Sequence, residues 1–203
     1  MQLLAFDLLG VIFPKKGGGS KKKIKELFDS LPEKHISFED FYSRYLKYNI
    51  GEIKNSDFWE GFTFNTKEIE KKYLDSYDIH DNLDILFLKL NENYKIIAIS
   101  NHPSEWVDYL SKKHELNKYF QKIYSSGSMK LRKPQKEMFL KIFKEQNIDP
   151  FECTIIDDQK KNLISASELG FKTIHVKINE DLIDFKPDLE IKSLNELITH
   201  FHH

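Results

Sequence analysis

Short apolar segments that alternate with helical patterns constrain the fold of this chain more than any other feature. The segments are Leu3–Phe6, Tyr94–Ile99, Lys122–Tyr124, Cys153–Ile156 and Lys172–Val176, and a further segment, Leu189–Ile191, follows them. After about residue 79, the stretches between these segments have the apolar spacing and the length of helices. Short strands that alternate with helices are typical of a parallel sheet covered by helices. The sequence therefore predicts an α/β fold with a parallel sheet.

The stretch between the first two segments follows a different pattern, with the spacing of several short helices and no convincing strand. Asp7 and Ser100 each follow an apolar strand, and they lie 93 positions apart in the chain. A complete βαβ crossover needs only about 30 residues. The residues beyond those that a crossover needs are about as many as a small helical domain contains. We therefore expect a core domain made of residues 1–14 and 80–203, interrupted by a helical insert at 15–79.

Composition excludes several classes of protein. The chain has 31 basic and 32 acidic residues and a net charge of −1, so its overall field does not suit a protein that coats nucleic acid or an anionic membrane. It has no uninterrupted apolar run of 18 residues, and Asp7 comes too early for a signal peptide. The single cysteine, Cys153, excludes a disulfide within the chain and favours a reducing compartment. We expect a soluble cytoplasmic protein with no nucleic-acid or membrane partner.

Polar side chains follow the apolar strands. Ligands of parallel α/β sheets bind outside the carboxyl ends of the strands, so these side chains are the candidates for a site. They are Asp7 after the first strand, Ser100 and Asn101 after the second, Lys133 beyond the third, and Asp157 and Asp158 after the fourth. A carboxylate can attack phosphorus, and Mg²⁺ held by other carboxylates can neutralise the charge of that attack, as can a lysine. The set therefore suits phosphoryl transfer.

These residues carry a resemblance to a known family. The sequence resembles the haloacid dehalogenase superfamily of aspartate-nucleophile phosphatases in four motifs, which occur in the family's order. They are Phe6-Asp7-Leu8-Leu9-Gly10-Val11, Ile96–Asn101, Arg132-Lys133-Pro134, and Ile155-Ile156-Asp157-Asp158 followed by Asn162, Ala166 and Gly170. The chain looks most like a helical-capped group that includes a sugar-1-phosphate phosphatase and the phosphatase domain of bifunctional epoxide hydrolases. The resemblance implies a Rossmann-like core sheet, a helical cap at about 15–79, and Mg²⁺-dependent hydrolysis of a small phosphate ester.

The resemblance also implies a Mg²⁺ site. Asp7 would be both the nucleophile and a metal ligand, and the backbone carbonyl of Leu9 would be a second ligand. Asp157 would bind the metal directly, and Asp158 would orient a bound water molecule or Lys133. Asp7, Leu9, Asp157 and Asp158 are therefore the residues expected at the metal.

A second set of residues is expected around the phosphoryl group of the substrate. The resemblance assigns the phosphoryl oxygens to Ser100 and to the backbone amide of Asn101, and it places Gly10 beside the same group. Lys133 would neutralise both Asp7 and the phosphate. Asp7, Ser100 and Lys133 are thus the expected catalytic residues, and the expected partner is a small phosphorylated substrate.

One position departs from the family pattern. Leu9 stands where most phosphatases of the family have a second Asp, which protonates the leaving oxygen and then activates water. General acid–base help is typically about 10²–10⁴-fold, so its loss should slow the reaction without abolishing it. The loss should favour substrates with good leaving groups, such as sugar-1-phosphates, acyl phosphates or aryl phosphates. His102 is a candidate substitute, although a histidine at such a place more often caps the next helix.

Other functions compete with the phosphatase. A degenerate member of the family could bind a phosphorylated ligand or a protein partner without catalysis, and Leu9 is its main support. A haloacid dehalogenase proper would use Asp7 against carbon without a metal, and the acidic pair Asp157-Asp158 argues against it. A two-component receiver domain uses similar groups in the reverse chain order. The sequence names no substrate, and it leaves open whether the protein is a monomer or a homodimer.

Overall fold

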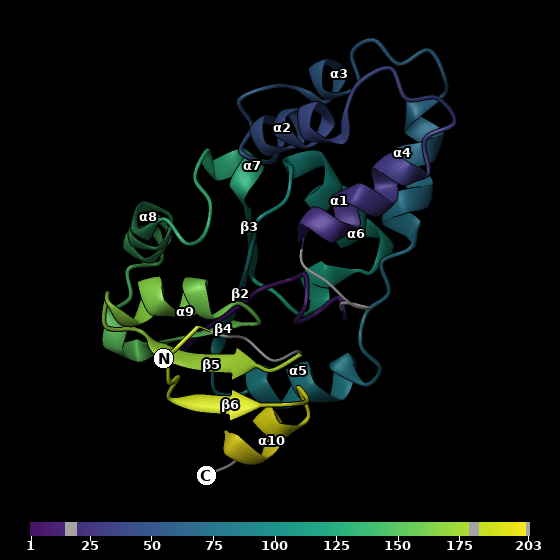
Figure 1. The fold of residues 1–203 in the computed structure, drawn as a ribbon. Coiled ribbons are helices and arrows are strands. Elements are labelled where there is room, and N and C mark those ends of the chain that lie inside the picture. The colour runs from purple at the N-terminus through teal and green to yellow at the C-terminus, as the bar shows by residue number, and fades with distance from the viewer. Residues whose placement is uncertain (15–19, 179–182, 202–203) are drawn as a thin grey trace.

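The computed structural model describes residues 1–14, 20–178 and 183–201, and its centre is a six-stranded sheet in which neighbouring strands are parallel (Figure 1). The strands are β1 (Leu3–Phe6), β2 (Lys95–Ser100), β3 (Lys122–Ser125), β4 (Cys153–Asp157), β5 (Lys172–Val176) and β6 (Leu189–Ile191). Their order across the sheet is β3-β2-β1-β4-β5-β6, so β1 lies between β2 and β4. The predicted α/β fold is confirmed.

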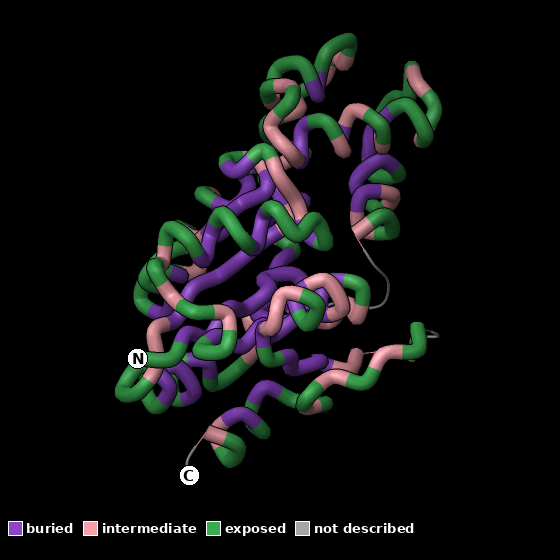
Figure 2. The backbone as a smooth tube through the Cα atoms, turned by 90° about the vertical axis from the view of Figure 1, so that its left-hand side faces the viewer, coloured by how far each residue is buried: buried purple, intermediate pink, exposed green. Residues whose placement is uncertain are grey.

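The strands build a hydrophobic core on each face of the sheet. Leu4 and Phe6 of β1 belong to one cluster of buried residues, and Leu3 and Ala5 belong to another. Side chains alternate between the two faces of a strand, so a strand that is apolar throughout must be covered on both faces. Figure 2 shows the buried residues gathered at the centre of the molecule. The residue that follows the central strand β1 therefore lies near the middle of the edge formed by the carboxyl ends of the strands.

Helices cover the sheet. They are α5 (Leu83–Asn91), α6 (Ser104–Lys113), α7 (Ser126–Met129), α8 (Lys136–Gln146), α9 (Lys160–Ser167) and α10 (Glu196–His200), with the short 3-10 helices η1 (Leu116–Lys118) and η2 (Pro150–Glu152). Phe87 of α5 packs in the first cluster, and Phe139 of α8 packs in the second. Because α6, α7 and α9 begin just after β2, β3 and β4, their first turns lie at the carboxyl ends of the strands. No helix of the described residues is long and apolar enough to cross a membrane.

Four helices lie between β1 and α5 in the chain. They are α1 (Ser20–Asp29), α2 (Phe38–Asn49), α3 (Asn55–Phe58) and α4 (Thr66–Asp75). Figure 1 shows them as a helical lobe beside the sheet. Aromatic rings fill this lobe, and the ring centre of Phe41 lies 4.9 Å from that of Phe58 and 5.3 Å from that of Phe28. We refer to these four helices and their connections as the insert. The expected domain boundaries at 15 and 79 stay a prediction, and residues 15–19 lie outside the described part of the chain.

The insert meets the core at the end of α2. Gly51 adopts a φ of +68°, and a Cβ built on it would lie only 2.3 Å from the carbonyl oxygen of Gly127 in α7. Next to this contact, the buried Asn49 donates a hydrogen bond to the carbonyl of Asn101 at 2.7 Å and accepts one from Ser126 Oγ at 3.1 Å. The end of α2 is therefore fixed against the loop that follows β2 and against α7.

Candidate active site

Asp7 and Asp157 lie together because β1 and β4 are neighbours. Asp7 directly follows β1, Asp157 ends β4, and the parallel register pairs Phe6 with Ile156. The amide of Asp7 continues the ladder by donating to the carbonyl of Ile156 at 2.8 Å. The structure thus brings two of the predicted carboxylates to one point at the edge of the sheet.

The ammonium group of Lys133 lies between these carboxylates. Its Nζ is 2.6 Å from Asp157 Oδ2 and 3.0 Å from Asp7 Oδ1, and all three side chains are buried. Burial by itself favours the neutral amine, but the charges of Asp157 and Asp7 outweigh burial and raise the pKa of Lys133. Lys133 is therefore a cation at neutral pH, in contact with the predicted nucleophile.

Hydrogen bonds fix both oxygens of Asp157. Oδ1 accepts from the amide of Gln159 at 2.8 Å, and Asn162 Nδ2 lies 3.0 Å from each oxygen. Asn162 belongs to α9, so the first turn of that helix orients the carboxylate. Burial raises the pKa of Asp157 against the opposing effect of Lys133, and the negative charge of Asp7 adds to the increase. A further cation beside Asp157 would therefore favour its ionised form.

The three acidic residues fit a divalent cation. Asp7, Asp157 and Asp158 each offer a carboxylate oxygen, and these oxygens all lie within 4.8 Å of one another. Asp7 and Asp157 share the single ammonium group of Lys133, and Asp158 adds a third carboxylate beside them. Mg²⁺ prefers oxygen ligands, including carboxylates and backbone carbonyls. The donor set therefore suits Mg²⁺.

Gly10 makes room for one of these carboxylates. Its φ is +101°, and a Cβ built on it would lie 2.6 Å from Cγ of Asp158. Any other residue would both strain the backbone and collide with that carboxylate. From the sequence, Gly10 is expected beside the phosphoryl group; in the structure it lies against the carboxylate of Asp158.

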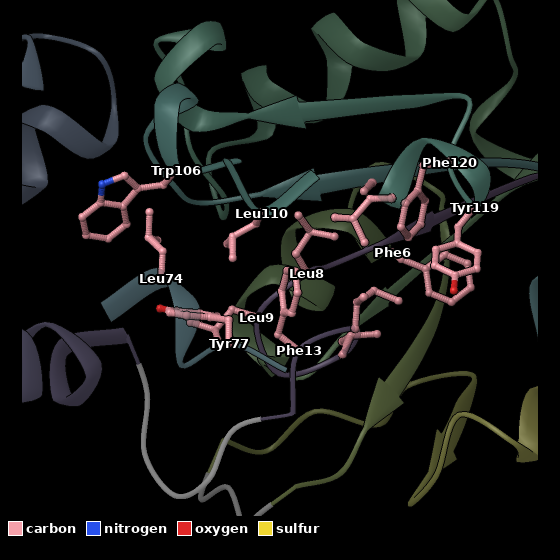
Figure 3. Packing of buried hydrophobic residues seen from close by; sticks show 14 of the residues in the cluster. Phe6, Leu8, Leu9, Phe13, Leu74, Tyr77, Trp106, Leu110, Tyr119 and Phe120 are labelled. Atoms are coloured by element: carbon pink, nitrogen blue, oxygen red, sulfur yellow. The ribbon is translucent and has the colours of Figure 1, made fainter. Parts of the chain in front are cut away.

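Leu9 presents an apolar side chain next to the nucleophile. It is buried, it lines the same pocket as Asp7, and it lies beside Tyr77 (Figure 3). The turn that carries Leu9 is closed by hydrogen bonds from the amides of Ile12 and Phe13 to the carbonyl of Leu8. The leucine side chain supplies neither a proton nor a charge at this point of the pocket.

Ser100 lies behind the wall of this pocket. It ends β2 with 0% of its surface exposed, and its hydroxyl is 2.8 Å from Nδ1 of His102. His102 lines the pocket with Asp7 and Lys133, whereas Ser100 is not one of the described residues that line it. Ser100 therefore contacts His102, and it is His102 that lines the pocket.

Asn101 connects the end of β2 to Lys133. Its Nδ2 donates to the carbonyl of Lys133 at 2.8 Å, and its Oδ1 accepts from the amide of Lys133 at 2.9 Å. The carbonyl of Asn101 in turn accepts a hydrogen bond from Asn49 of the insert. Sequence reasoning missed Asn49, because its partners Asn101 and Ser126 are 52 and 77 positions away and no local pattern marks it.

The pocket around these groups is small. Its described walls are Asp7, Leu9, Ser20, Asn101, His102, Arg132, Lys133, Gln159, Lys161 and Asn162. Leu9 is the one apolar residue among them. The cavity has a volume of about 20 Å³, which admits about one water molecule. A larger cavity of about 450 Å³ is lined by residues of α1, α4 and their flanks in the insert, away from the carboxylates.

Known proteins with similar sequences are hydrolases. D-ribitol-5-phosphate phosphatase of Bacteroides thetaiotaomicron is 27% identical over 166 residues, which are 76% of this chain and 73% of that protein. The chloroplast flavin mononucleotide hydrolase 1 of Arabidopsis thaliana is 26% identical over 120 residues, which are 59% of this chain. The matched part spans only 49% of the length of the plant protein.

Solved structures share the fold. A HAD family enzyme of Bacteroides thetaiotaomicron, in complex with magnesium and inorganic phosphate, has a TM-score of 0.71 at 27% identity, and the match covers 90% of this chain and 97% of that one. A HAD phosphatase of Thermococcus onnurineus has a TM-score of 0.72 at 20% identity, covers 100% and 98% of the two chains, and supports the fold alone.

A family model agrees with these similarities. Residues 21–176 match the model described as haloacid dehalogenase-like hydrolase, and this segment holds three of the four motifs and most of the sheet. Asp7 precedes the matched segment, but β1 carries it into the same sheet edge as the other three motifs. From the matched segment, the shared fold and the placement of the strand-end residues, we conclude that this chain belongs to the haloacid dehalogenase-like hydrolase family.

Proposed function

We propose that this protein is a Mg²⁺-dependent phosphatase that hydrolyses a small phosphorylated metabolite, with sugar phosphates as the first class to test. The observation that carries the proposal is the carboxylate of Asp7 held against Lys133, beside Asp157 and Asp158, at the carboxyl edge of the sheet. The names of the two similar enzymes, a ribitol-5-phosphate phosphatase and a flavin mononucleotide hydrolase, support a phosphate monoester as substrate.

Asp7 is the nucleophile in this proposal. Its carboxylate oxygen bonds to phosphorus while the bond between phosphorus and the ester oxygen breaks, which leaves an aspartyl phosphate on Asp7. Water then attacks phosphorus, the bond to Asp7 breaks, and inorganic phosphate departs. Lys133 contacts Asp7 and offsets the negative charge on the phosphoryl oxygens during both steps.

Asp7, Asp157 and Asp158 would hold the metal ion, together with the backbone carbonyl of Leu9. When bound, Mg²⁺ supplies the positive charge that lets an anionic carboxylate approach an anionic phosphate. Asn162 contributes by holding both oxygens of Asp157 in one orientation.

The remaining predicted residues, Asn101, Ser100 and Gly10, have three different roles. Asn101 lines the pocket, so its backbone amide is proposed to hold a phosphoryl oxygen while its side chain fixes Lys133. Ser100 reaches the phosphoryl group only if it releases His102. Gly10 contributes indirectly, because its lack of a side chain leaves space for the carboxylate of Asp158.

We propose that residues 15–79 are a cap domain that closes over the pocket and selects the substrate. The small volume of the pocket, with Ser20 of the insert in its wall, supports this role. We also propose a cytoplasmic location for a monomer or homodimer. Burial raises the pKa of Cys153, and an unreactive buried thiol is compatible with a reducing compartment.

A second candidate function is that of a catalytically weak or inactive protein that binds a phosphorylated ligand or a protein partner. Leu9 favours this candidate, because it removes the expected proton donor from the pocket. The remaining groups would still bind a phosphate and a metal ion in such a protein.

Release of phosphate from p-nitrophenyl phosphate distinguishes the two functions. The wild type should turn over with Mg²⁺ and stop with EDTA, and Asp7→Asn should be inactive under both conditions. Equal rates for the wild type and Asp7→Asn would instead identify a binding protein. A panel of phosphorylated metabolites, assayed with Mg²⁺ and with chelator, would then name the substrate class.

A further inference from the structure

Cleavage of an alkyl phosphate creates a basic oxygen that needs a proton. Among the described walls of the pocket, most side chains cannot provide one: Ser20 is a hydroxyl, Asn101, Gln159 and Asn162 are amides, and Leu9 is apolar. Lysine and arginine side chains in general keep their protons near neutral pH, and Asp7 is engaged as the nucleophile. Histidine is the side chain that both gives and takes a proton in this range. Only His102 among these described walls is of that type.

His102 is held in one orientation from several sides. Its Nδ1 lies 2.8 Å from the hydroxyl of Ser100, which is completely buried. Its ring centre lies 6.2 Å from that of Tyr77 at 84°, and 6.4 Å from that of Trp106. Its backbone carbonyl accepts a hydrogen bond from the amide of Gly127 at 3.2 Å. With only 4% of its surface exposed, the residue nevertheless lines the pocket, so its ring is directed by packing and not by solvent.

The Ser100 contact assigns different tasks to the two ring nitrogens. The serine hydroxyl can accept a hydrogen bond from Nδ1–H or donate one to Nδ1, so it remains a partner in both protonation states of the ring. Nδ1 thereby serves orientation, so a proton transfer by this ring would use Nε2. A serine behind a histidine in this way is a positioning residue.

We propose that His102 is the general acid and base of the phosphatase, and that Ser100 positions it, in place of the carboxylate that Leu9 lacks. This inference rests on the proposed function. In the first step, the oxygen of Asp7 bonds to phosphorus, the ester bond breaks, and Nε2 of His102 gives its proton to the departing oxygen. In the second step, Nε2 takes a proton from water as the water oxygen bonds to phosphorus and the bond to Asp7 breaks. The histidine and the aspartate both return to their starting states.

Dependence of the rate on the leaving group tests this role. The p-nitrophenolate anion is a weak base and leaves without a proton, whereas an alkoxide is a strong base and must be protonated as it leaves. His102→Gln should therefore lower kcat/KM for an alkyl phosphate, such as glycerol 2-phosphate, by about 10²-fold or more, and for p-nitrophenyl phosphate by less than about 10-fold. Ser100→Ala should shift the ratio of the two rates in the same direction to a smaller extent.

Two further variants make the experiment specific. His114→Gln is the matched control, because His114 also contacts Tyr77 but does not belong to the described wall of the pocket, so both rates should stay at the wild-type level. Leu9→Asp combined with His102→Gln should restore the alkyl phosphate rate, because it returns a proton donor to the neighbouring position.

The outcomes separate the inference from the proposed function. Equal losses on both substrates for His102→Gln, or no loss on either, would overturn the role of His102 while the phosphatase stands. If His102→Gln does not fold, the wild type alone decides. A shallow dependence of kcat/KM on the basicity of the leaving group, measured across aryl and alkyl phosphates, supports His102 as the general acid. A steep dependence overturns that role. No Mg²⁺-dependent turnover of either substrate above Asp7→Asn would overturn the phosphatase and the role of His102 together.

Discussion

The carboxylate centre at the edge of the sheet and a carboxylate in the insert are held in opposite ways. Asp157 is fully buried, pairs with the cation Lys133, and has a second carboxylate, that of Asp7, bonded to the same ammonium group. Charges of both signs are therefore concentrated there. Glu70 of α4 is partly buried, and no lysine or arginine among the described residues forms an ion pair with it.

Neutral N–H donors hold Glu70. Its Oε1 accepts from the indole of Trp106 at 2.6 Å, from the amide of Asn55 at 2.8 Å and from the indole of Trp59 at 3.3 Å. Trp106 belongs to α6 of the core, and the other two donors belong to the insert. Asp157 is thus held among charges of both signs, whereas Glu70 uses neutral donors to join the insert to the core.

Removal of Lys133 should give the largest effect. Lys133→Met leaves Asp7 and Asp157 buried without their cation, and breaking a buried ion pair typically costs about 3–5 kcal/mol. Urea denaturation should show a free energy of unfolding lower by about that amount, and Mg²⁺-dependent turnover should be lost. Lys71→Met, which breaks an exposed pair with Asp75, is the control and should leave both quantities unchanged. Wild-type stability of Lys133→Met would show that the carboxylates do not depend on this cation.

Mg²⁺ should stabilise only the centre at the sheet edge. An ion that binds the folded state alone adds about 2.7 kcal/mol at 100 times its Kd. Thermal unfolding with Mg²⁺ or with EDTA measures this shift, which should disappear in Asp157→Asn and persist in Glu70→Gln. A shift that survives in Asp157→Asn would place the ion elsewhere in the molecule.

Loss of the Glu70 carboxylate should weaken the attachment of the insert. Glu70→Ala leaves the indole N–H of the buried Trp106 without its acceptor, which costs about 1–3 kcal/mol. Both tryptophans of the chain donate to Glu70, so intrinsic fluorescence during urea unfolding reports directly on this centre. Glu70→Gln keeps an acceptor and should lose less stability. Turnover by the folded protein should stay near the wild-type rate, and a parallel loss would show that the two centres are coupled.

Asn49 offers a smaller test of communication between the regions. Asn49→Ala removes the hydrogen bond to the carbonyl of Asn101, and one such bond contributes about 0.5–1.5 kcal/mol. Because Asn101 holds the backbone of Lys133, we expect KM for p-nitrophenyl phosphate to rise more than kcat falls. Ser126→Ala keeps the bond between Asn49 and Asn101 and should change KM less. An unchanged KM in Asn49→Ala would show that the loop with Asn101 keeps its position without the hydrogen bond from the insert.

The smallest expected effect is a dependence of stability on pH at the junction of α6 and the insert. Burial lowers the pKa of His114, whose Nε2 faces the carbonyl of Tyr77. A lowered pKa means that the folded state resists protonation, so stability is complete above the ordinary pKa of 6.5 and declines as the pH falls below it. Urea midpoints at pH 7.5 and pH 5.5, about one unit on either side of that value, should show a smaller decline in His114→Gln than in the wild type. Equal declines would assign the effect to other groups.

The sequence allowed the sheet and most of its polar edge to be predicted, because these features have local causes. An apolar run that ends in an aspartate, such as Leu3–Phe6 before Asp7, is visible within a few residues. Parallel strands place Asp7 and Asp157 at the same edge of the sheet, and the pairing of β1 with β4 then brings them together. The resemblance to a known family, and not the local pattern, indicated which strand ends belong to one site.

The contacts between insert and core could not be predicted in this way. Glu70 and Trp106 are 36 positions apart, and nothing around either residue indicates the other. The sequence also does not show that His102 lines the pocket while Ser100 lies behind it. Both residues are at the end of the same strand, and only packing decides which of them lines the pocket. Such features depend on the tertiary packing around each side chain.

The contact between Gly51 and Gly127 restricts how this chain can diversify. Any side chain on Gly51 would push against the carbonyl of Gly127, and a Cβ on Gly127 would lie 2.5 Å from the amide of Ser104. A larger residue at either position therefore requires the end of α2, α7 and the start of α6 to move apart. These two glycines thus set the closest distance at which the insert can approach the core.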